Sequence, residues 1–360
     1  MSSRRRFVRD LAAATAGMIV MGRGLSDAGV RLQQPGAAAR RRQVMVGGRR
    51  VKTVDVHAHI VVPEASLLMG KVWPPNDTGI FGPHRLRAMD EQGIDVEAIS
   101  INPDWYAVDK DLARKIIRLQ NQTLAELCAA QPDRFVGLAS VALQHPDLAA
   151  EQLDEAVTTW KMRGVAIGGS VEGEELSHPR FEPFWAKAEA LGTMVFIHPQ
   201  PAPPRPFERF KGNGNLDNVI GNPLETTIAL SHLIFEGTLD RFPALKICAA
   251  HGGGFLPSYS GRMDHGCGVR PDQCTGKPLK KIPSAYLKQL YFDSLVFTSE
   301  GLRHLVAECG PGQIMMGTDA PYPWTTTSVD HILGTPTLTD GDRAAILGDT
   351  ACRLLHIAPW

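Results

Sequence analysis

The chain lacks the sequence features that mark several protein classes. Its 38 Lys and Arg residues equal its 38 Asp and Glu residues, so no excess of positive charge points to nucleic-acid binding. Six cysteines are scattered over 360 residues without a Cys-x-x-Cys pair, which argues against a zinc finger or a disulfide-rich scaffold and predicts reduced, mostly structural thiols. With 43% apolar and 21% charged residues, the composition is that of a globular protein with one barrel-sized domain or two small ones.

No apolar run near the start is long enough for a stable membrane anchor, but the first fifty residues differ from the rest. Residues 3–9, Ser-Arg-Arg-Arg-Phe-Val-Arg, fit the twin-arginine export pattern, and a weakly apolar run over residues 11–22 follows. We therefore predict a twin-arginine-type signal and flexible leader over residues 1–50, and export to the periplasm. The alternative is a disordered basic leader on a cytoplasmic protein.

From residue 51 onward, short β-branched runs alternate with longer segments of helical period, which is typical of parallel strands joined by crossover helices. Eight strands are expected over residues 51–56, 96–101, 135–140, 164–167, 194–197, 245–250, 290–293 and 313–317. Helices are expected over residues 111–130, 147–161, 181–191, 223–239 and 300–309.

This count and size predict an α/β fold of the (β/α)8 TIM-barrel type over residues 51–360. A doubly wound open sheet would also alternate strands and helices. The first strand, however, is not followed by the glycine-rich fingerprint of a dinucleotide-binding sheet, so the barrel is favoured.

Metal-binding side chains follow several of the predicted strands. His57 and His59 end the first, His198 the fifth, His251 the sixth and Asp319 the eighth. In a barrel these strand ends converge on the face that carries active sites, and imidazole and carboxylate are ligands that zinc takes in catalytic sites. A single His-x-His or Thr-Asp can be an ordinary polar group, but the five together predict a metal centre.

The segments that contain these residues read VDVHAHI, VFIHPQ, AAHGGG and MMGTDAPYPW. Together with RFVGLASVALQHPDLA, GNPLETTIA, GRMDHGCGVRPD and YFDSLVFT, they resemble the amidohydrolase-related family that includes aminocarboxymuconate semialdehyde decarboxylase, in the same order. The resemblance covers roughly residues 51–356 and implies a barrel of the metal-dependent hydrolase type.

The resemblance also implies roles for single residues. His57, His59, His198 and Asp319 match the metal ligands, with zinc expected and manganese as the alternative. His251 matches an acid/base that stands beside the metal-bound water, and Asp319 is a second catalytic candidate. A bound metal lowers the pKa of water to about 7, and a neighbouring histidine can move a proton during catalysis.

Arg262, within GRMDHG, resembles an arginine that reaches a substrate carboxylate across a dimer interface. The resemblance therefore implies a homodimer and a small-molecule carboxylate substrate, since an arginine fork suits carboxylate. No nucleic-acid partner and no stable membrane anchor are expected.

The fourth strand ends in Gly168-Gly169, without the lysine that bridges two ions in binuclear amidohydrolases, which favours one metal per chain. The chain departs from the decarboxylase pattern in two places. The insertion after Met69-Gly70-Lys71 is short and lacks the family's extra arginine, so Lys71 is a possible substitute. Gln200 stands where the decarboxylase has tryptophan. These differences predict a different pocket.

The leading hypothesis is a nonoxidative decarboxylase, a carbon–carbon lyase that acts on a carboxylated aromatic or muconate-like acid through metal-activated water and His251. A hydrolase or hydratase of an amide, lactone or alkene on the same site is the alternative, because the fold does not decide between them. A noncatalytic barrel is disfavoured, because all the site residues are intact.

Overall fold

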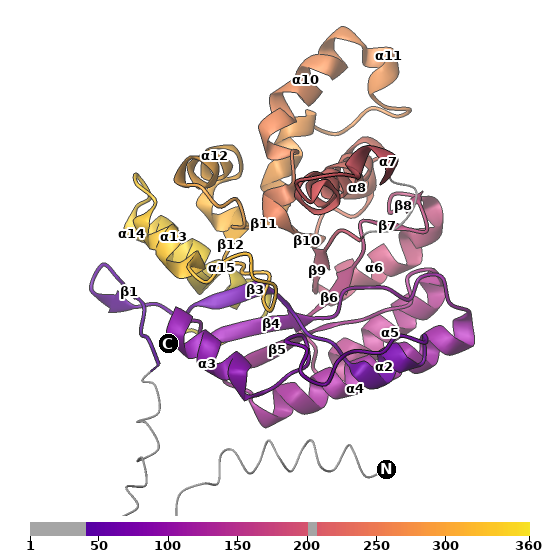
Figure 1. Ribbon diagram of the computed structural model, residues 1–360. Coiled ribbons are helices and arrows are strands. Elements are labelled where there is room, and N and C mark those ends of the chain that lie inside the picture. The colour runs from indigo at the N-terminus through magenta and orange to yellow at the C-terminus, as the bar shows by residue number, and fades with distance from the viewer. Residues whose placement is uncertain (1–40, 201–206) are drawn as a thin grey trace, which may run out of the picture.

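Eight parallel strands form the centre of the molecule (Figure 1). The computed structural model describes residues 41–200 and 207–360, and in them these strands are hydrogen-bonded in the order β12-β11-β10-β9-β6-β5-β4-β3. Every neighbouring pair is parallel. The strands are β3 (Val54–His59), β4 (Val96–Ser100), β5 (Phe135–Ala139), β6 (Gly164–Ile167), β9 (Met194–Ile197), β10 (Lys246–Ala249), β11 (Tyr291–Asp293) and β12 (Ile314–Met315).

The sheet closes into a barrel because the segment after β12 pairs with β3. The main-chain N–H of Asp319 donates to the carbonyl of His57 (2.8 Å), and that of His59 donates to the carbonyl of Ala320 (2.6 Å). Gly317 lets the two segments approach, since a Cβ at this position would lie 3.0 Å from the Cβ of His57. The predicted (β/α)8 barrel is confirmed.

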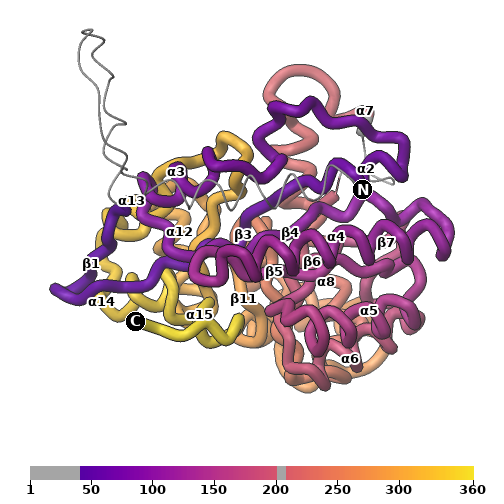
Figure 2. Tube along the Cα trace, turned by 90° about the horizontal axis from the view of Figure 1, so that it is seen from below, coloured from indigo at the N-terminus to yellow at the C-terminus, as the bar shows by residue number. Residues whose placement is uncertain are grey.

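Helices cover the outside of the barrel, as Figures 1 and 2 show from two directions. The longer ones are α4 (Lys110–Ala130), α5 (Pro146–Thr158), α6 (Glu182–Leu191), α8 (Asn222–Phe235) and α12 (Ser299–Cys309). Shorter ones are α2 (Pro63–Leu67), α3 (Pro83–Gln92), α7 (Phe207–Phe210), α9 (Thr238–Arg241), α13 (Ser328–Gly334), α14 (Asp340–Ala344) and α15 (Thr350–Leu354). None of the helices in the described ranges is long and apolar enough to cross a membrane.

The helix predicted over residues 223–239 is divided into α8 and α9. Gly237, which separates them, has a φ of 71°, a left-handed conformation that glycine adopts without steric cost and that ends an α-helix. Elsewhere the sequence locates helix starts well. At α4, for example, the side chain of Asp109 accepts the N–H groups of Asp111 and Leu112 at 3.0 and 2.9 Å, which is the role of an N-cap.

A bulge in β3 turns both of its histidines toward the same end of the barrel. Val54 and Val56 belong to the apolar cluster that also contains Phe196, whereas Ala58 belongs to the cluster that packs against the helices. The pairing with β4 shifts register between Asp55 and Ala58. Because a bulge reverses the alternation of side chains, His57 follows Val56 inward, and its ring lies 5.0 Å from that of Phe196.

Residues 41–50, which the sequence pattern assigned to the flexible leader, are part of the folded unit. They form a two-stranded hairpin, β1 (Met45–Val46) and β2 (Arg49–Arg50), and the side chains of Val44 and Val46 are buried. Arg41 reaches Asp95 at 2.6 Å. The folded part therefore begins before residue 50, and residues 1–40 of the predicted leader lie outside the described residues.

A helical arm, α10 (Ser260–Val269) and α11 (Pro271–Cys274), projects from the barrel at the top of Figure 1. Cys267 and Cys274 form a disulfide across its bend. The expectation of reduced thiols is therefore wrong for this pair, because the turn at Arg270 brings their Cα atoms to 4.7 Å. Among the described residues the other four cysteines are free.

Candidate metal centre and active site

Three histidines and one aspartate meet at the carboxyl end of the barrel, as the sequence predicts. One ligand atom from each of His57, His59, His198 and Asp319 can be chosen so that all lie within 4.8 Å of one another, and all four residues are buried. Oδ1 of Asp319 lies 3.2 Å from Nε2 of His57 and 3.1 Å from Nε2 of His59. The rings of His59 and His198 are 4.7 Å apart. Strands β3, β9 and the end of β12 thus supply one compact set.

The atoms that face one another in this set have no hydrogen-bond partners. Nε2 of His57, Nε2 of His59, both ring nitrogens of His198 and Oδ1 of Asp319 are buried and unsatisfied. Each such atom costs about 1–3 kcal/mol, which is large beside a typical net stability of about 5–15 kcal/mol. A cation that accepts their lone pairs removes this cost, so the donor set fits a divalent metal ion, with His and Asp ligands of the kind found in catalytic zinc sites.

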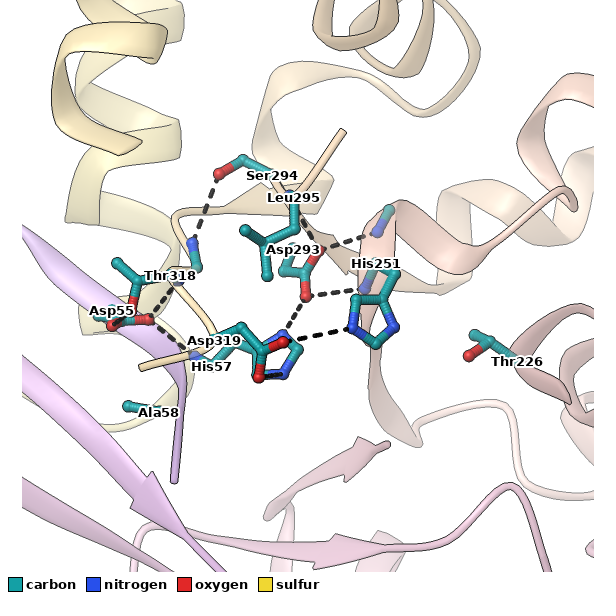
Figure 3. Close-up of polar contacts among 12 residues, drawn as sticks. Asp55, His57, Ala58, Thr226, His251, Asp293, Ser294, Leu295, Thr318 and Asp319 are labelled. Atoms are coloured by element: carbon teal, nitrogen blue, oxygen red, sulfur yellow. Dashed lines mark hydrogen bonds and ion pairs between the residues drawn. The ribbon is translucent and has the colours of Figure 1, made fainter. Parts of the chain in front are cut away.

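Asp293, at the end of β11, orients His57 (Figure 3). Its Oδ2 accepts Nδ1–H of His57 at 2.6 Å and the main-chain N–H of His251 at 2.9 Å. Its Oδ1 accepts the N–H groups of Gly252 and Leu295 at 2.8 and 3.1 Å. Because Nδ1 of His57 is held as the donor, Nε2 keeps its lone pair for a metal.

Ser100, at the end of β4, performs the same task for His59. Its hydroxyl donates to the carbonyl of Ala58 at 3.2 Å, and its Oγ lies 3.0 Å from Nδ1 of His59. Since the single hydroxyl hydrogen is used, Oγ accepts from Nδ1–H. This tautomer again leaves Nε2 of His59 free to bind a metal.

Asp55 holds together the two main-chain segments that close the barrel, β3 and the segment after β12, whose junction is the barrel seam. It accepts the N–H of His57 at 3.0 Å, the N–H of Thr318 at 3.1 Å and the hydroxyl of Thr318 at 2.5 Å. Asp55 thus positions the segments that carry His57 and Asp319 and does not bond to a ligand ring. Its contribution to the centre is therefore made through the backbone.

The carboxylates set the electrostatics of the centre. Burial alone would lower the pKa of His57, but Asp319 and Asp293 outweigh it and raise that pKa to about 10. Burial lowers the pKa of His59 to about 4, and burial together with the neighbouring rings lowers the pKa of His198 well below its ordinary value. Burial would raise the pKa of Asp319, but the effect of His57 and the other imidazoles is larger and lowers that pKa. The carboxylates thus favour a positive charge among the rings, and a divalent cation bound there would displace the proton and supply that charge.

His251 stands on the other side of Asp319. Its Nε2 lies 3.9 Å from Oδ2 of Asp319, its side chain is 15% exposed, and its Nδ1 is buried without a hydrogen-bond partner. The two oxygens of Asp319 thus face different neighbours, Oδ1 the ligand histidines and Oδ2 His251. Both residues adopt positive φ, 54° for His251 and 62° for Asp319, a conformation that costs a non-glycine residue about 1 kcal/mol or more and gathers at functional sites.

A cavity of about 560 Å³ opens onto the ligand set. Its lining includes His59, His198 and Asp319 together with Trp73, Asn102, Gln120, Tyr322 and Trp324. A ligand that fills it would therefore contact three of the four metal-binding residues.

Neither basic residue considered for the substrate carboxylate lines this cavity. Arg262 lies exposed on α10, within the projecting arm, and is absent from the lining of this cavity. Nζ of Lys71 pairs with Asp104 at 2.6 Å, so its charge is already balanced. Gln200, the residue that departs from the family tryptophan, does line the cavity.

Sequence comparisons agree with this geometry. The family model described as amidohydrolase matches residues 54–357. The 2-amino-3-carboxymuconate-6-semialdehyde decarboxylase of Dictyostelium discoideum is 31% identical over 280 residues, which cover 75% of each chain.

Solved structures are similar over most of the chain. A 2,6-dihydroxybenzoate decarboxylase complexed with 2,6-dihydroxybenzoate has a TM-score of 0.76 and 27% identity, covering 85% of this chain and 99% of that one. A dihydroxybenzoic acid decarboxylase from a Polaromonas species, with bound manganese and the inhibitor 2-nitroresorcinol, has a TM-score of 0.75 and 25% identity, covering 85% and 97%.

The chain belongs to the amidohydrolase superfamily. Within it, the chain is an enzyme of the branch that includes aminocarboxymuconate semialdehyde decarboxylase, and its centre suits a divalent metal ion.

Asp293 and Ser100 were not singled out from the sequence. Both stand at the carboxyl end of a strand, as the predicted ligands do, and this position is the sequence feature that could have identified them. A carboxylate at the end of the seventh strand could therefore have been chosen by the rule that selected Asp319. Ser100 carries no such signal, because serine is common at strand ends.

We expect Asp293→Asn to weaken divalent-metal affinity about 10- to 100-fold, the usual effect of losing a group that orients a ligand. The asparagine amide would place its NH₂ group against main-chain N–H groups, which in the wild-type protein donate to the Asp293 carboxylate. Chelator competition measures the affinity. Asp240→Asn is the matched control, because Asp240 accepts the Tyr286 hydroxyl at 2.6 Å and the Lys280 N–H at 3.0 Å, outside the metal centre. Equal affinities in the two folded variants would contradict the assignment.

Proposed function

We propose that the protein is a metal-dependent nonoxidative decarboxylase of a carboxylated aromatic or muconate-like acid. The observation that carries the proposal is the cavity whose lining includes His59, His198 and Asp319, because an acid bound in it would lie against the metal ligands. The relatives named as decarboxylases, one of them complexed with 2,6-dihydroxybenzoate, support this choice over a hydrolase or hydratase.

We propose one ion per chain, zinc with manganese as the alternative, because Gly168 and Gly169 at the end of β6 provide no bridging lysine. When bound, a divalent ion supplies a Lewis acid that polarises substrate oxygen atoms and stabilises developing negative charge. His57, His59, His198 and Oδ1 of Asp319 would hold it.

The reaction breaks the bond between the ring and its carboxylate and forms a carbon–hydrogen bond in its place. The electron pair of the broken bond remains on the ring carbon, which must then receive a proton. Asp319 lines the cavity and its Oδ2 faces Nε2 of His251 at 3.9 Å. We therefore assign His251 and Asp319 as the acid/base pair that supplies this proton.

Metal-loaded enzyme should contain one equivalent of metal and release carbon dioxide from aromatic acids, while metal-free enzyme should not. His251→Ala should keep its metal and lose about a hundredfold or more in kcat, the scale of lost acid/base catalysis. His304→Ala, which removes an exposed histidine on α12, should leave the rate unchanged.

Elemental analysis and carbon dioxide assays make these measurements. Two metal equivalents would contradict the single-ion proposal, and metal-free His251→Ala would move His251 into the ligand set. If the enzyme releases acid from lactones or amides without carbon dioxide, the assigned function would change from decarboxylase to hydrolase.

We also propose that the enzyme is a homodimer in which Arg262 completes the neighbouring subunit's site. The projection of α10 away from its own barrel supports this proposal (Figure 1), because an exposed arginine on an arm can reach a second copy.

Arg262→Ala should raise KM and lower the rate without loss of metal, because a carboxylate contact is removed. Mixing it with His251→Ala should recover roughly a quarter of wild-type activity, since random pairing makes half of the dimers mixed and each mixed dimer regains one complete site. Steady-state kinetics and native mass spectrometry measure these outcomes. Mixed dimers without recovered activity would exclude a shared site.

We propose export into an oxidising compartment. The disulfide between Cys267 and Cys274 supports it, since such bonds persist in periplasmic and extracellular proteins and are rare in the cytosol.

In protein isolated from native cells and then denatured, Cys267 and Cys274 should resist alkylation until a reductant is added. Cys128 should react without a reductant. Peptide mass spectrometry after cell fractionation measures this. Reactive thiols at both arm positions would argue for the cytoplasm.

A further inference from the structure

Arg85, on the covering helix α3, is a buried charged residue outside the ligand set. It is 4% exposed, and its Nε donates to Oε2 of Glu97, on β4, at 2.7 Å. Glu97 is buried as well. Because removing two charges from water is costly, a pair of apolar residues of similar volume often stabilises a fold as well or better. The buried ion pair therefore points to a task that apolar side chains cannot perform.

The rest of the Arg85 guanidinium binds both main-chain segments of the barrel seam. Its Nη1 donates to the carbonyl of His59 at 3.1 Å, and its Nη2 donates to the carbonyl of Ala320 at 3.4 Å. The main-chain N–H of His59 donates to the same Ala320 carbonyl at 2.6 Å. One side chain thus joins a candidate metal ligand to the residue that directly follows another ligand, Asp319.

Arg85 complements Asp55 at the barrel seam. The Asp55 carboxylate accepts the main-chain N–H groups of His57 and Thr318. The Arg85 guanidinium donates to main-chain carbonyls two residues further along each of the same two segments. An anion therefore binds the N–H donors at one end of the seam, and a cation binds the carbonyl acceptors at the other end. The ligands lie between these two attachments.

Arginine suits this position because its planar guanidinium carries donors in several fixed directions. Nε, Nη1 and Nη2 each bind a different acceptor here. A lysine ammonium is a single charge on a flexible chain and could not hold all three acceptors in one geometry. Metal ligands must be held to within about 0.5 Å, and Nε2 of His59 lies 3.1 Å from Oδ1 of Asp319. Their spacing depends on how the two segments of the seam are joined.

We infer that Arg85 is a positioning residue, which sets the spacing of His59 and Asp319 and thereby raises the affinity of the centre for its metal ion. This inference rests on the proposed metal-dependent function and adds to it a residue outside the ligand set. Arg85 does not line the cavity, so it acts through the main chain of the ligand segments and not on a bound substrate.

The test measures binding of Zn²⁺ and of Mn²⁺, each alone, to the full-length protein by chelator competition. Arg85→Lys should weaken this affinity about 10- to 100-fold, the usual effect of losing a residue that orients a metal ligand. Thermal unfolding provides a second measurement. The rise in Tm on metal addition should be smaller in Arg85→Lys than in the wild-type protein, because a more weakly bound ion stabilises the folded state less.

Arg134→Lys is the matched control, because Arg134 makes the same kinds of contact away from the seam. Its side chain is 13% exposed and pairs with Asp90 at 2.8 Å. It donates to the carbonyls of Asp95 and Ile94 at 3.0 and 3.2 Å. These two carbonyls precede β4, whereas the metal ligands follow the ends of their strands. Arg134→Lys should lower the Tm of the metal-free protein and leave both the metal affinity and the metal-induced rise in Tm unchanged.

A double variant, Arg85→Met with Glu97→Leu, keeps the test decisive if Arg85→Lys does not fold. Apolar residues then replace both charges of the buried pair, an exchange that folds often tolerate. The carbonyls of His59 and Ala320 lose the guanidinium in this variant too. Its metal affinity should therefore also fall about tenfold or more.

The possible results separate this inference from the proposed function. Unchanged metal affinity in the Arg85 variants would overturn the positioning role. An equal loss of affinity in Arg134→Lys would also overturn it, because the effect would then follow from a general loss of stability. If the wild-type protein binds metal but releases no carbon dioxide from aromatic acids, the decarboxylase is overturned and the positioning role stands, because neither measurement depends on turnover.

Discussion

The structure depends on holding three imidazoles and one carboxylate around a single point. With their ligand atoms within 4.8 Å of one another and without hydrogen-bond partners, these groups destabilise the fold unless a cation joins them. The surrounding polar residues hold these groups in position. Asp293 and Ser100 each fix one histidine tautomer, and Asp55 joins the two chain segments that meet at the barrel seam.

Asp319 connects the ligand histidines with His251. One of its oxygens faces the ligand histidines and the other faces His251, so a single side chain contacts both. Its left-handed backbone, and the close approach of Gly317 to His57, place it there. A strained backbone of this kind persists only where surrounding interactions hold it in place. Here the hydrogen bonds across the barrel seam do so.

The cavity is lined by three of the four candidate metal ligands together with residues from other segments. In a site of this kind the ligand set determines the type of chemistry, and the rest of the lining contributes to which molecule binds. In this chain the rest of the lining includes Trp73, Asn102 and Gln120, the last from the covering helix α4. A protein can therefore keep the reaction and change the substrate through a few side chains far from the ligands in sequence.

The sequence alone determined the strand and helix alternation, the barrel and the five strand-end residues of the candidate metal centre, because each rests on a local pattern: periodic apolar residues, and chemistry-bearing residues at strand ends. The division of these five into four ligands and His251 came from the resemblance to the family. Tertiary structure decided the rest. The bulge that directs His57 inward, the bond from Asp293 to His57 across 236 residues, and the disulfide at Cys267 arise from how segments meet. Gln120 sits in a helical pattern like any polar helix residue, and only the packed barrel shows that its amide lies buried beside the cavity. Local periodicity does not specify such partners, because a contact between distant segments depends on the whole fold.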